Sequence, residues 1–179
     1  TAIEWRGHKV LHDNKVRFFG QPIALIVADS FENANAAIRF VKAEYAPESF
    51  ETNFDKARVD AKNLKTNSNY KRGTEKKFKE AFASVESEFN IPIEVHNAME
   101  LFATIAHWEG EDKVTLYDKT QGPKSTQFTV SRTFGIPDKN VRVIAENVGG
   151  AFGSGLRSWA NVPAACIAAK KLNRPVKLV

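Results

Sequence analysis

The stretch Val141-Arg-Val-Ile-Ala-Glu-Asn-Val-Gly-Gly-Ala-Phe-Gly-Ser-Gly-Leu-Arg157 holds four of the ten glycines of the chain, at positions 149, 150, 153 and 155. Its first four residues predict a short strand, and Ser158–Leu172 predicts a helix after the glycines. Glycine allows positive φ angles and close approach to the main chain. Unpaired N–H groups converge where a strand passes through such a turn into a helix, so the stretch predicts a site for an anion or an oxo group. A tight turn that binds nothing is the alternative.

Two common nucleotide-binding motifs do not fit this stretch. Gly150–Gly155 has the glycine spacing of a phosphate-binding loop, but Leu156 and Arg157 stand where that motif needs Lys and then Ser or Thr. A dinucleotide-binding turn needs G-x-G-x-x-G, whereas the run from Gly150 is G-x-x-G-x-G. Phe152, between glycines, either forms the wall of a pocket or fills a core.

The composition is that of an ordinary globular domain, or parts of two. The chain has 179 residues and a net charge of +5. The densest basic cluster is typical of a solvated helix face, so nucleic-acid binding is not expected; it consists of Lys71, Arg72, Lys76, Lys77 and Lys79. No apolar run reaches the roughly 18 residues needed to cross a bilayer, so no membrane span is expected. The single Cys166 rules out a disulfide framework within the chain and predicts a buried small residue in an Ala-rich helix.

The first half of the chain predicts a compact unit followed by a linker. Val16–Ala28 is rich in β-branched and aromatic residues and predicts two strands joined by a tight turn. Ser30 predicts the cap of a helix from Phe31 to about Glu44. Pro47–Asn69 is polar and aperiodic, which indicates an extended linker or a segment lying across another surface. Thr74 predicts the cap of a short helix that ends at Phe82.

The second half predicts a β-rich section and then alternating helices and strands. Strands are expected at Ser84–Ile93 (where the alternation is partial), Leu101–Trp108, Lys113–Tyr117, Val141–Ile144 and Arg174–Val179. Glu109–Asp112 predicts a hairpin turn, and Gly122-Pro123 predicts the start of a helix that Gly135–Pro137 ends. These elements indicate an α+β fold.

Two further positions are candidate site residues. Gln121 stands where a strand ends and a helix begins, a common place for ligand contact in α/β layers. Its amide both donates and accepts, which suits an oxo or hydroxo ligand, although a loop amide bonded to nearby backbone is the alternative. His96–Glu100 places a His near a Glu, but no second His lies at metal-ligand spacing.

Several separated motifs resemble one family when taken in order. They are Phe19–Ala28, His96–Glu100, Thr104–Gly110, Tyr117–Gly122, Phe134–Pro137 and Val141–Gly153. Together they resemble the molybdenum-binding subunit of the xanthine dehydrogenase/aldehyde oxidase family. Gly149–Trp159 is most similar to bacterial periplasmic-type aldehyde oxidoreductase subunits.

The resemblance implies a domain organisation and a fold. Residues 1–46 would be the C-terminal part of an α/β-hammerhead domain, 47–71 a linker, and 72–179 the N-terminal part of a mixed α/β molybdopterin-binding domain. Both ends of the sequence look cut, so a fragment of a longer or split chain is expected.

The resemblance also implies site residues. Gln121 would be the catalytic-site amide that faces the metal's apical ligand, and the glycine loop would present N–H groups to the pterin and to the metal's oxygens. The implied cofactor-binding residues are Gly149, Gly150, Ala151, Phe152, Gly153, Gln121 and Gly122. The implied substrate pocket consists of Phe152, Leu156 and Arg157. No side-chain metal ligand is expected, because the pterin dithiolene holds the metal.

The function implied by the resemblance is a molybdopterin-dependent oxidoreductase that oxidises aldehydes, or related heterocycles, to acids with water as the oxygen source. The expected cofactor is molybdopterin in its cytosine dinucleotide form with molybdenum. FAD and a [2Fe–2S] cluster are expected on partner subunits, in the bacterial cytoplasm or periplasm.

Three departures from the family pattern qualify this implication. Xanthine-type enzymes carry a purine-binding Glu where this chain has Leu156, which favours aldehydes. Ala98–Phe102 replaces the usual Pro-Met-Glu-Pro-His. The family's catalytic Glu, a general base, would lie C-terminal to Val179, so the chain is expected to be incomplete as a catalyst. The alternatives are a non-catalytic fragment that binds an anion or a partner through its basic region, and an inactive structural remnant.

Overall fold

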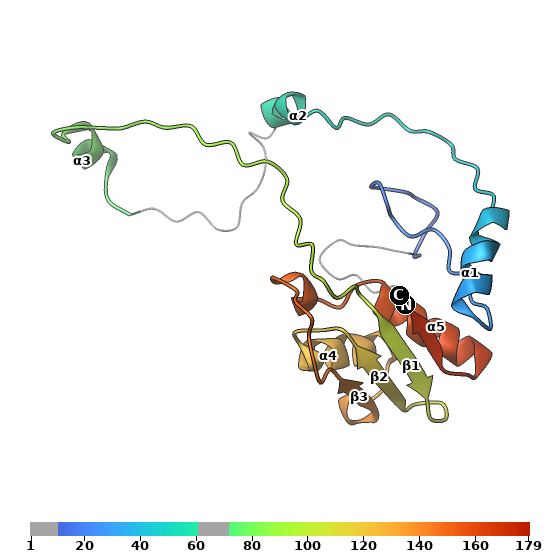
Figure 1. The fold of residues 1–179 in the computed structure, drawn as a ribbon. Coiled ribbons are helices and arrows are strands. Elements are labelled where there is room, and N and C mark those ends of the chain that lie inside the picture. The colour runs from blue at the N-terminus through green and yellow to red at the C-terminus, as the bar shows by residue number, and fades with distance from the viewer. Residues whose placement is uncertain (1–10, 61–71) are drawn as a thin grey trace. The chain divides into compact units, whose positions relative to one another are not determined.

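The computed structural model describes residues 11–60 and 72–179, which fall into two units (Figure 1). One unit combines Thr1–Val41 with Glu94–Val179, and the other is Lys42–Ile93. The expectations for residues 1–10 and 61–71, which include Lys71 and part of the predicted linker, lie outside the described residues. The mixture of helices and strands is the predicted α+β class.

A four-stranded sheet with the order β3-β2-β1-β4 forms the centre of the first unit. Strands β1 (Thr104–Trp108) and β2 (Val114–Asp118) form the predicted antiparallel hairpin, in which Thr104 pairs with Asp118. Strand β3 (Val141–Ile144) lies parallel to β2, and β4 (Val176–Leu178) lies antiparallel to β1. All four strands coincide with segments expected from the sequence.

Helices α4 (Pro123–Phe134) and α5 (Asn161–Leu172) pack on one face of the sheet (Figure 1). Alternation along β1 and β2 directs one set of side chains toward these helices. The fully buried core residues include Ala106, Val114 and Leu116 from the sheet and Val130, Ala165 and Cys166 from the helices. The expected burial of Cys166 is therefore confirmed, and burial raises the pKa of its thiol to about 12.

Both helices end at residues with positive φ. Gly135 (φ 65°) ends α4 at the predicted position, and its N–H donates to the carbonyl of Ser131. Asn173 (φ 48°) ends α5 in the same left-handed region, which Asn tolerates better than most residues. Helix α4 begins with Pro123 in its first turn, where a missing N–H costs least. Helix α5 begins at Asn161, later than the predicted start at Ser158.

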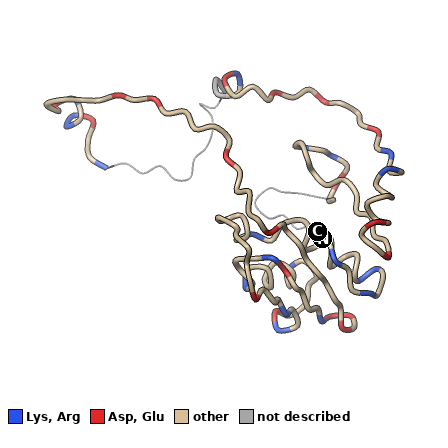
Figure 2. Tube along the Cα trace, viewed as in Figure 1, with Lys and Arg blue, Asp and Glu red and all other residues tan. Residues whose placement is uncertain are grey.

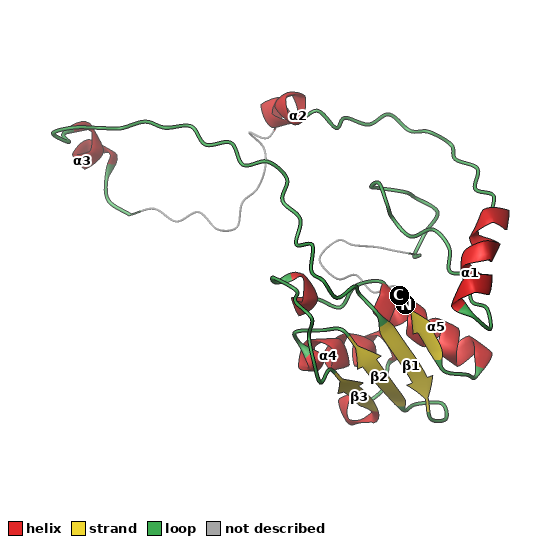
Figure 3. Ribbon diagram, viewed as in Figure 1, coloured by secondary structure: helices red, strands yellow, loops and turns green. Residues whose placement is uncertain are grey.

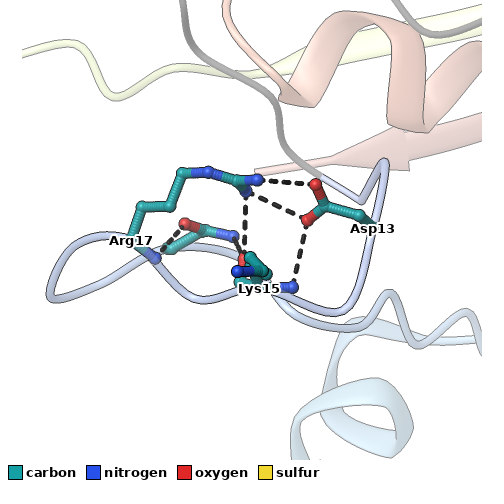
Figure 4. Close-up of polar contacts among 4 residues, drawn as sticks. Asp13, Lys15 and Arg17 are labelled. Atoms are coloured by element: carbon teal, nitrogen blue, oxygen red, sulfur yellow. Dashed lines mark hydrogen bonds and ion pairs between the residues drawn. The ribbon is translucent and has the colours of Figure 1, made fainter. Parts of the chain in front are cut away.

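The prediction of two strands at residues 16–28 is wrong, because the structure forms a looped segment there. Arg17 and Asp13 form an ion pair of 2.6 Å, and the Arg17 N–H donates to the side chain of Gln21 (Figure 4). The guanidinium lowers the pKa of the Asp13 carboxyl well below its usual range. A strand needs a neighbour for its hydrogen bonds, and no strand in the described residues pairs with this segment. The following helix α1 (Phe31–Ala37) is capped by Ser30 as predicted but, with the 3₁₀ turn Ile38–Phe40, is shorter than expected.

The described residues of the second unit, Lys42–Ile93, form two short helices and long extended stretches (Figure 3). Helix α2 (Phe54–Asp60) lies inside the segment predicted as an extended linker, so that prediction is wrong there. Helix α3 (Glu75–Lys79) is capped by Thr74 as predicted but is shorter than expected. The stretch 84–93 is extended and exposed, and it pairs with no strand among the described residues, so the expected strand is also wrong.

Candidate functional site

The two predicted halves of the site lie at the same edge of the sheet. Gln121 follows β2, and the glycine loop, which we define as residues 149–155, follows β3. Strands β2 and β3 are neighbours and parallel, so their carboxyl ends meet at this edge. The carboxyl ends of neighbouring parallel strands are the usual ligand-binding position in α/β sheets.

Direct contacts join the two halves. The backbone N–H of Gln121 donates to the carbonyl of Gly155 over 2.8 Å. Gly155 is buried, and a Cβ placed there would lie 3.2 Å from the Cγ atom of Gln121 and 3.1 Å from the Cβ atom of Ala151. A Cβ at this position would crowd the junction, which accounts for one of the four glycines without invoking a ligand.

The middle of the glycine loop has an unusual backbone conformation. Gly150, Phe152 and Gly153 have φ angles of 90°, 51° and 95°. Among the described residues, the four consecutive amides from Gly150 to Gly153 donate no hydrogen bond within the chain. Backbone that passes between right- and left-handed conformations directs successive N–H groups toward one side, and such concavities bind anions and oxo groups. The prediction that this loop binds an anion or an oxo group stays a prediction.

Bonds on either side hold the loop in this shape. The N–H and the hydroxyl of Ser154 both donate to the carbonyl of Ala151, at 2.9 Å and 2.7 Å. The indole N–H of Trp159 donates to the carbonyl of Ser154 at 2.7 Å. At the other end, the carboxylate of Glu100 accepts the N–H of Gly149 at 2.6 Å, and the Glu100 N–H donates to the Gly149 carbonyl at 3.1 Å.

The three residues predicted for the substrate pocket all lie on the exposed side of the loop. Phe152 is 75% exposed and Leu156 is 57% exposed. Arg157 is exposed as well. Phe152 therefore does not fill a core, which removes one of its two sequence interpretations, and its role in a pocket stays a prediction.

A buried network of polar side chains lies directly beneath the junction of Gln121 and the loop. The hydroxyl of Thr120 donates to the Gly155 carbonyl at 3.1 Å and accepts the N–H of Gly122 at 3.0 Å. The hydroxyl of Thr126, in the first turn of α4, lies 3.3 Å from the Thr120 hydroxyl and 3.4 Å from the Asp118 carboxyl. Desolvation by burial raises the pKa of Asp118, even though hydroxyls from Thr104 and Thr126 contact it.

Lys119 is the one charged residue whose side chain lies buried here without a hydrogen-bonding partner among the described residues. Its Nζ atom lies 4.1 Å from the centroid of the Phe102 ring. The Phe102 ring packs edge to face against Trp159, with centroids 6.1 Å apart. The amine is therefore buried against an aromatic face, and its charge also acts on the neighbouring Asp118 carboxyl.

The other sequence candidates do not join the site as a metal or nucleophile centre. The Glu100 carboxylate is engaged with Gly149, and His96 is exposed. In the part of the chain that the structure describes, no cluster of three His, Cys, Asp or Glu side chains is placed to hold a metal ion. The described helices include none that is long and apolar enough to span a membrane.

Two of the three lysines on α3 are paired with acidic neighbours. Lys79 lies 2.8 Å from Glu75, and Lys76 lies 3.8 Å from Glu80. Figure 2 shows residues of both charges spread along the chain. The prediction of a solvated helix face is confirmed for α3, since these side chains are exposed.

Reasoning from the sequence missed the polar network. Asp118 lies on the same core-facing side of β2 as Val114 and Leu116. Thr104 lies on the core-facing side of β1. Polar residues at core-facing positions of two paired strands were the available signal, because buried polar groups need partners.

Comparison with known proteins places the chain in a family. Residues 57–179 match the family described as "Molybdopterin cofactor-binding domain". Residues 2–49 match the family described as "Aldehyde oxidase and xanthine dehydrogenase, a/b hammerhead domain". The chain belongs to the xanthine dehydrogenase/aldehyde oxidase family. The resemblance read from the sequence motifs is therefore confirmed.

Individual members of the xanthine dehydrogenase/aldehyde oxidase family show the extent of the similarity. The chain is 30% identical over 173 residues to the aldehyde oxidoreductase molybdenum-binding subunit of Escherichia coli K12, which spans 96% of this chain and 24% of that protein. It is 30% identical over 178 residues to a probable xanthine dehydrogenase component of Bacillus subtilis, across 94% of this chain and 24% of that protein. The chain thus spans about a quarter of the length of these relatives. A carbon monoxide dehydrogenase from Oligotropha carboxidovorans superimposes with a TM-score of 0.42 and 29% identity, over 46% of this chain and 10% of that chain.

Proposed function

We propose that this chain forms part of a molybdenum hydroxylase that oxidises aldehydes to carboxylic acids with water as the oxygen source. Its own contribution is to position the molybdopterin cofactor through residues 149–153, Gln121 and Gly122. The observation that carries this proposal is the row of unbonded amides from Gly150 to Gly153 beside Gln121. Residues 1–46 would then complete a hammerhead domain, with 47–71 as a linker and 72–179 as the start of the cofactor-binding domain.

The residues present fit such a cofactor. The loop has four consecutive amides that donate no hydrogen bond among the described residues, and donors of this kind suit the oxygen-rich and nitrogen-rich edge of a pterin. The absence of a His, Cys, Asp and Glu cluster among the described residues is compatible with a metal that the pterin itself holds. Gln121 follows the neighbouring strand, and its carboxamide can donate to, or accept from, a ligand of the metal.

When bound, the cofactor supplies the two-electron redox chemistry that converts an aldehyde and water into a carboxylic acid, two electrons and two protons. The chain's own residues bind and orient. The amides from Gly150 to Gly153 fix the position of oxygen atoms by donated hydrogen bonds, and fixed donors cost no reorganisation during reaction. Gln121 is held against Gly155 by its own backbone, so its side chain starts from a defined point.

The finer assignments are also proposals. Leu156 stands where xanthine-type relatives carry a purine-binding Glu, and an apolar side chain there favours aldehydes over purines. Phe152 and Arg157 are exposed beside it and would line the substrate side of the loop. The cofactor would be the cytosine dinucleotide form, with FAD and [2Fe–2S] on partner subunits.

The test compares two glycines with positive φ angles, at which substitution by Ala should introduce similar backbone strain. Gly153 and Gly110 have φ angles of 95° and 77°, and a Cβ at either would meet no atom within 4 Å. The strain of Gly153→Ala and Gly110→Ala should therefore be similar. We expect Gly153→Ala in the intact protein to lower the molybdenum and pterin content per chain by about tenfold, as the loss of a fixed donor arrangement predicts. Gly110→Ala, in the hairpin turn, should retain both.

The first experiment uses the wild-type protein and tests the proposed function directly. Metal analysis should find about one molybdenum atom per chain, and aldehydes should be oxidised with oxygen from water. An active preparation without molybdenum would overturn the proposal. Equal cofactor loss in both glycine variants would contradict the assignment of the glycine loop to the cofactor-binding site.

The alternative of an anion-binding or partner-binding fragment has less support. On α3, Lys76 is paired with Glu80 and Lys79 with Glu75, which reduces the net positive charge of this region. Binding to an anionic partner that weakens steeply with salt would favour it.

A further inference from the structure

The polar network beneath the site contains a hydroxyl that contacts both halves of the site at once. Thr120 is 2% exposed, and its hydroxyl donates to the Gly155 carbonyl while accepting the N–H of Gly122. The same carbonyl accepts the N–H of Gln121. One carbonyl of the glycine loop is therefore held by two donors from consecutive residues at the end of β2.

The direction of each bond in this network can be followed from its donors. Thr120 has one hydroxyl proton, and the Gly155 carbonyl, which cannot donate, takes it. The Thr120 oxygen then accepts from the Gly122 amide and, in addition, from the hydroxyl of Thr126 at 3.3 Å. With its bonds thus filled, the hydroxyl is fixed in one rotational position.

Thr126 has a single proton and two neighbours that accept it, Thr120 and the Asp118 carboxyl. A protonated Asp118 can donate to Thr126, and Thr126 then donates to Thr120. Desolvation by burial raises the pKa of Asp118. The opposite oxygen of Asp118 accepts from Thr104, which in turn accepts from Asn161 at 2.8 Å. The chain of bonds thus runs from the start of α5 through the sheet and α4 to the loop.

We propose that Thr120 is a positioning residue that fixes Gln121 against the glycine loop, with its hydroxyl oriented by Thr126 and Asp118. The geometry supports this more directly than a role in stability alone, because the bonds of Thr120 end on the carbonyl that Gln121 also contacts. The importance of that position rests on the function proposed above for Gln121. The junction itself does not depend on that function and can be measured without it.

The first measurement determines the hydrogen-exchange rates of the amides at the junction in the intact protein. Thr120→Val keeps the shape of the side chain and removes both its donor and its acceptor. We expect the amides of Gln121 and Gly122 to exchange about tenfold faster, the change that loss of one buried hydrogen bond produces. Thr120→Ser restores the hydroxyl and should stay within about twofold of wild type. Thr133→Val is the matched control, because its hydroxyl bonds within its own helix to Thr129.

The second measurement records the spectrum of the bound molybdenum and the kinetic constants of the enzyme. In Thr120→Val we expect an altered electron paramagnetic resonance spectrum of the bound molybdenum, and a fall in kcat of about tenfold or more with little change in KM, as a small misplacement of a positioned group predicts. Thr120→Ser and Thr133→Val should both give the wild-type spectrum. A purely structural role would lower the unfolding temperature of Thr120→Val without changing the spectrum.

The outcomes separate the two proposals. If wild-type protein holds no molybdenum, the proposed function fails, and the exchange rates still decide the role of Thr120. If Thr120→Val matches Thr133→Val in both exchange and spectrum, the inference about Thr120 is wrong while the function stands. Should Thr120→Val fail to fold, Thr126→Ala removes only the orienting hydroxyl. It should then speed exchange of the same two amides by about threefold, and unchanged rates would contradict the inference.

Discussion

Two stretches of this chain alternate apolar and polar residues, and only one of them forms strands. In β1 and β2 the alternate residues Ala106, Val114 and Leu116 are fully buried. In the stretch 85–93 the alternate residues Phe89, Ile91 and Ile93 are between 78% and 97% exposed. The first stretch has a hairpin partner and two helices against one face, whereas the second pairs with no strand among the described residues. Alternation thus marks the capacity to form a strand, and a hydrogen-bonding neighbour decides whether the strand forms.

The sharpest test of this comparison is a pair of truncations. Leu116→Ala removes a fully buried side chain from a central strand and should lower the free energy of unfolding by about 2–5 kcal/mol. Phe89→Ala truncates a side chain that is 86% exposed and should change it by less than about 0.5 kcal/mol. Urea denaturation measures both. A comparable loss for Phe89→Ala would mean that the stretch 85–93 is packed in solution.

A second pair of variants tests the buried amine beside the site. Lys119 and Lys170 both place their Nζ atoms over aromatic rings, but Lys170 also donates to the Glu111 carbonyl at 2.7 Å. A desolvated amine without hydrogen bonds is costly, so Lys119→Met should raise the free energy of unfolding by about 1 kcal/mol. Lys170→Met should lower it slightly or leave it unchanged. A clear loss of stability in Lys119→Met would show that its amine has a partner in solution.

The dependence of stability on pH provides a third test, through Asp118. Its pKa is raised in the folded state by desolvation, so the unfolded chain releases this proton first as the pH increases. The contribution of Asp118 to stability is therefore largest below the usual Asp pKa of about 3.9 and falls as the pH rises through the folded-state value. Asp118→Asn, which keeps a donor toward Thr126, should remove this slope. Denaturation midpoints at a series of pH values measure it, and an unchanged slope would contradict the assignment.

The smallest expected effect is at Cys166. The thiol is fully buried and its pKa is raised to about 12, so it should not react with a thiol reagent at pH 8 in the folded chain. Denaturant should release one reactive thiol per chain. Rapid labelling without denaturant would indicate that α5 opens readily.

Much of the fold of residues 104–178 could be predicted from the sequence. Apolar runs and alternation predicted all four strands, and Pro123 and Gly135 predicted the ends of α4 through their special backbone conformations. The strands expected at 16–28 and 84–93 did not form, because pairing depends on a neighbour that a local pattern does not contain. Helix α2 was missed for the opposite reason, since a polar segment without clear periodicity gave no sign of it.

The site was partly predictable as well. The positions of Gln121 after one strand and of the glycines after another predicted that both lie at one edge of the sheet, whereas their roles in binding stay predictions. The family resemblance, which rests on several separated motifs, supplied the chemistry. The network of Asp118, Thr120 and Thr126 was not predicted, because hydrogen bonds between residues from different elements depend on how the elements pack.

The parallel pairing of β2 and β3 has a consequence for how this site tolerates change. Neighbouring strands lie about 4.8 Å apart, a distance that backbone hydrogen bonding imposes whatever the side chains. The strand ends from which Gln121 and the glycine loop extend therefore keep the spacing of the sheet, and the hydrogen bond from the Gln121 N–H to the Gly155 carbonyl joins the two segments. Side chains on either segment can be exchanged without changing the distance between the two strand ends.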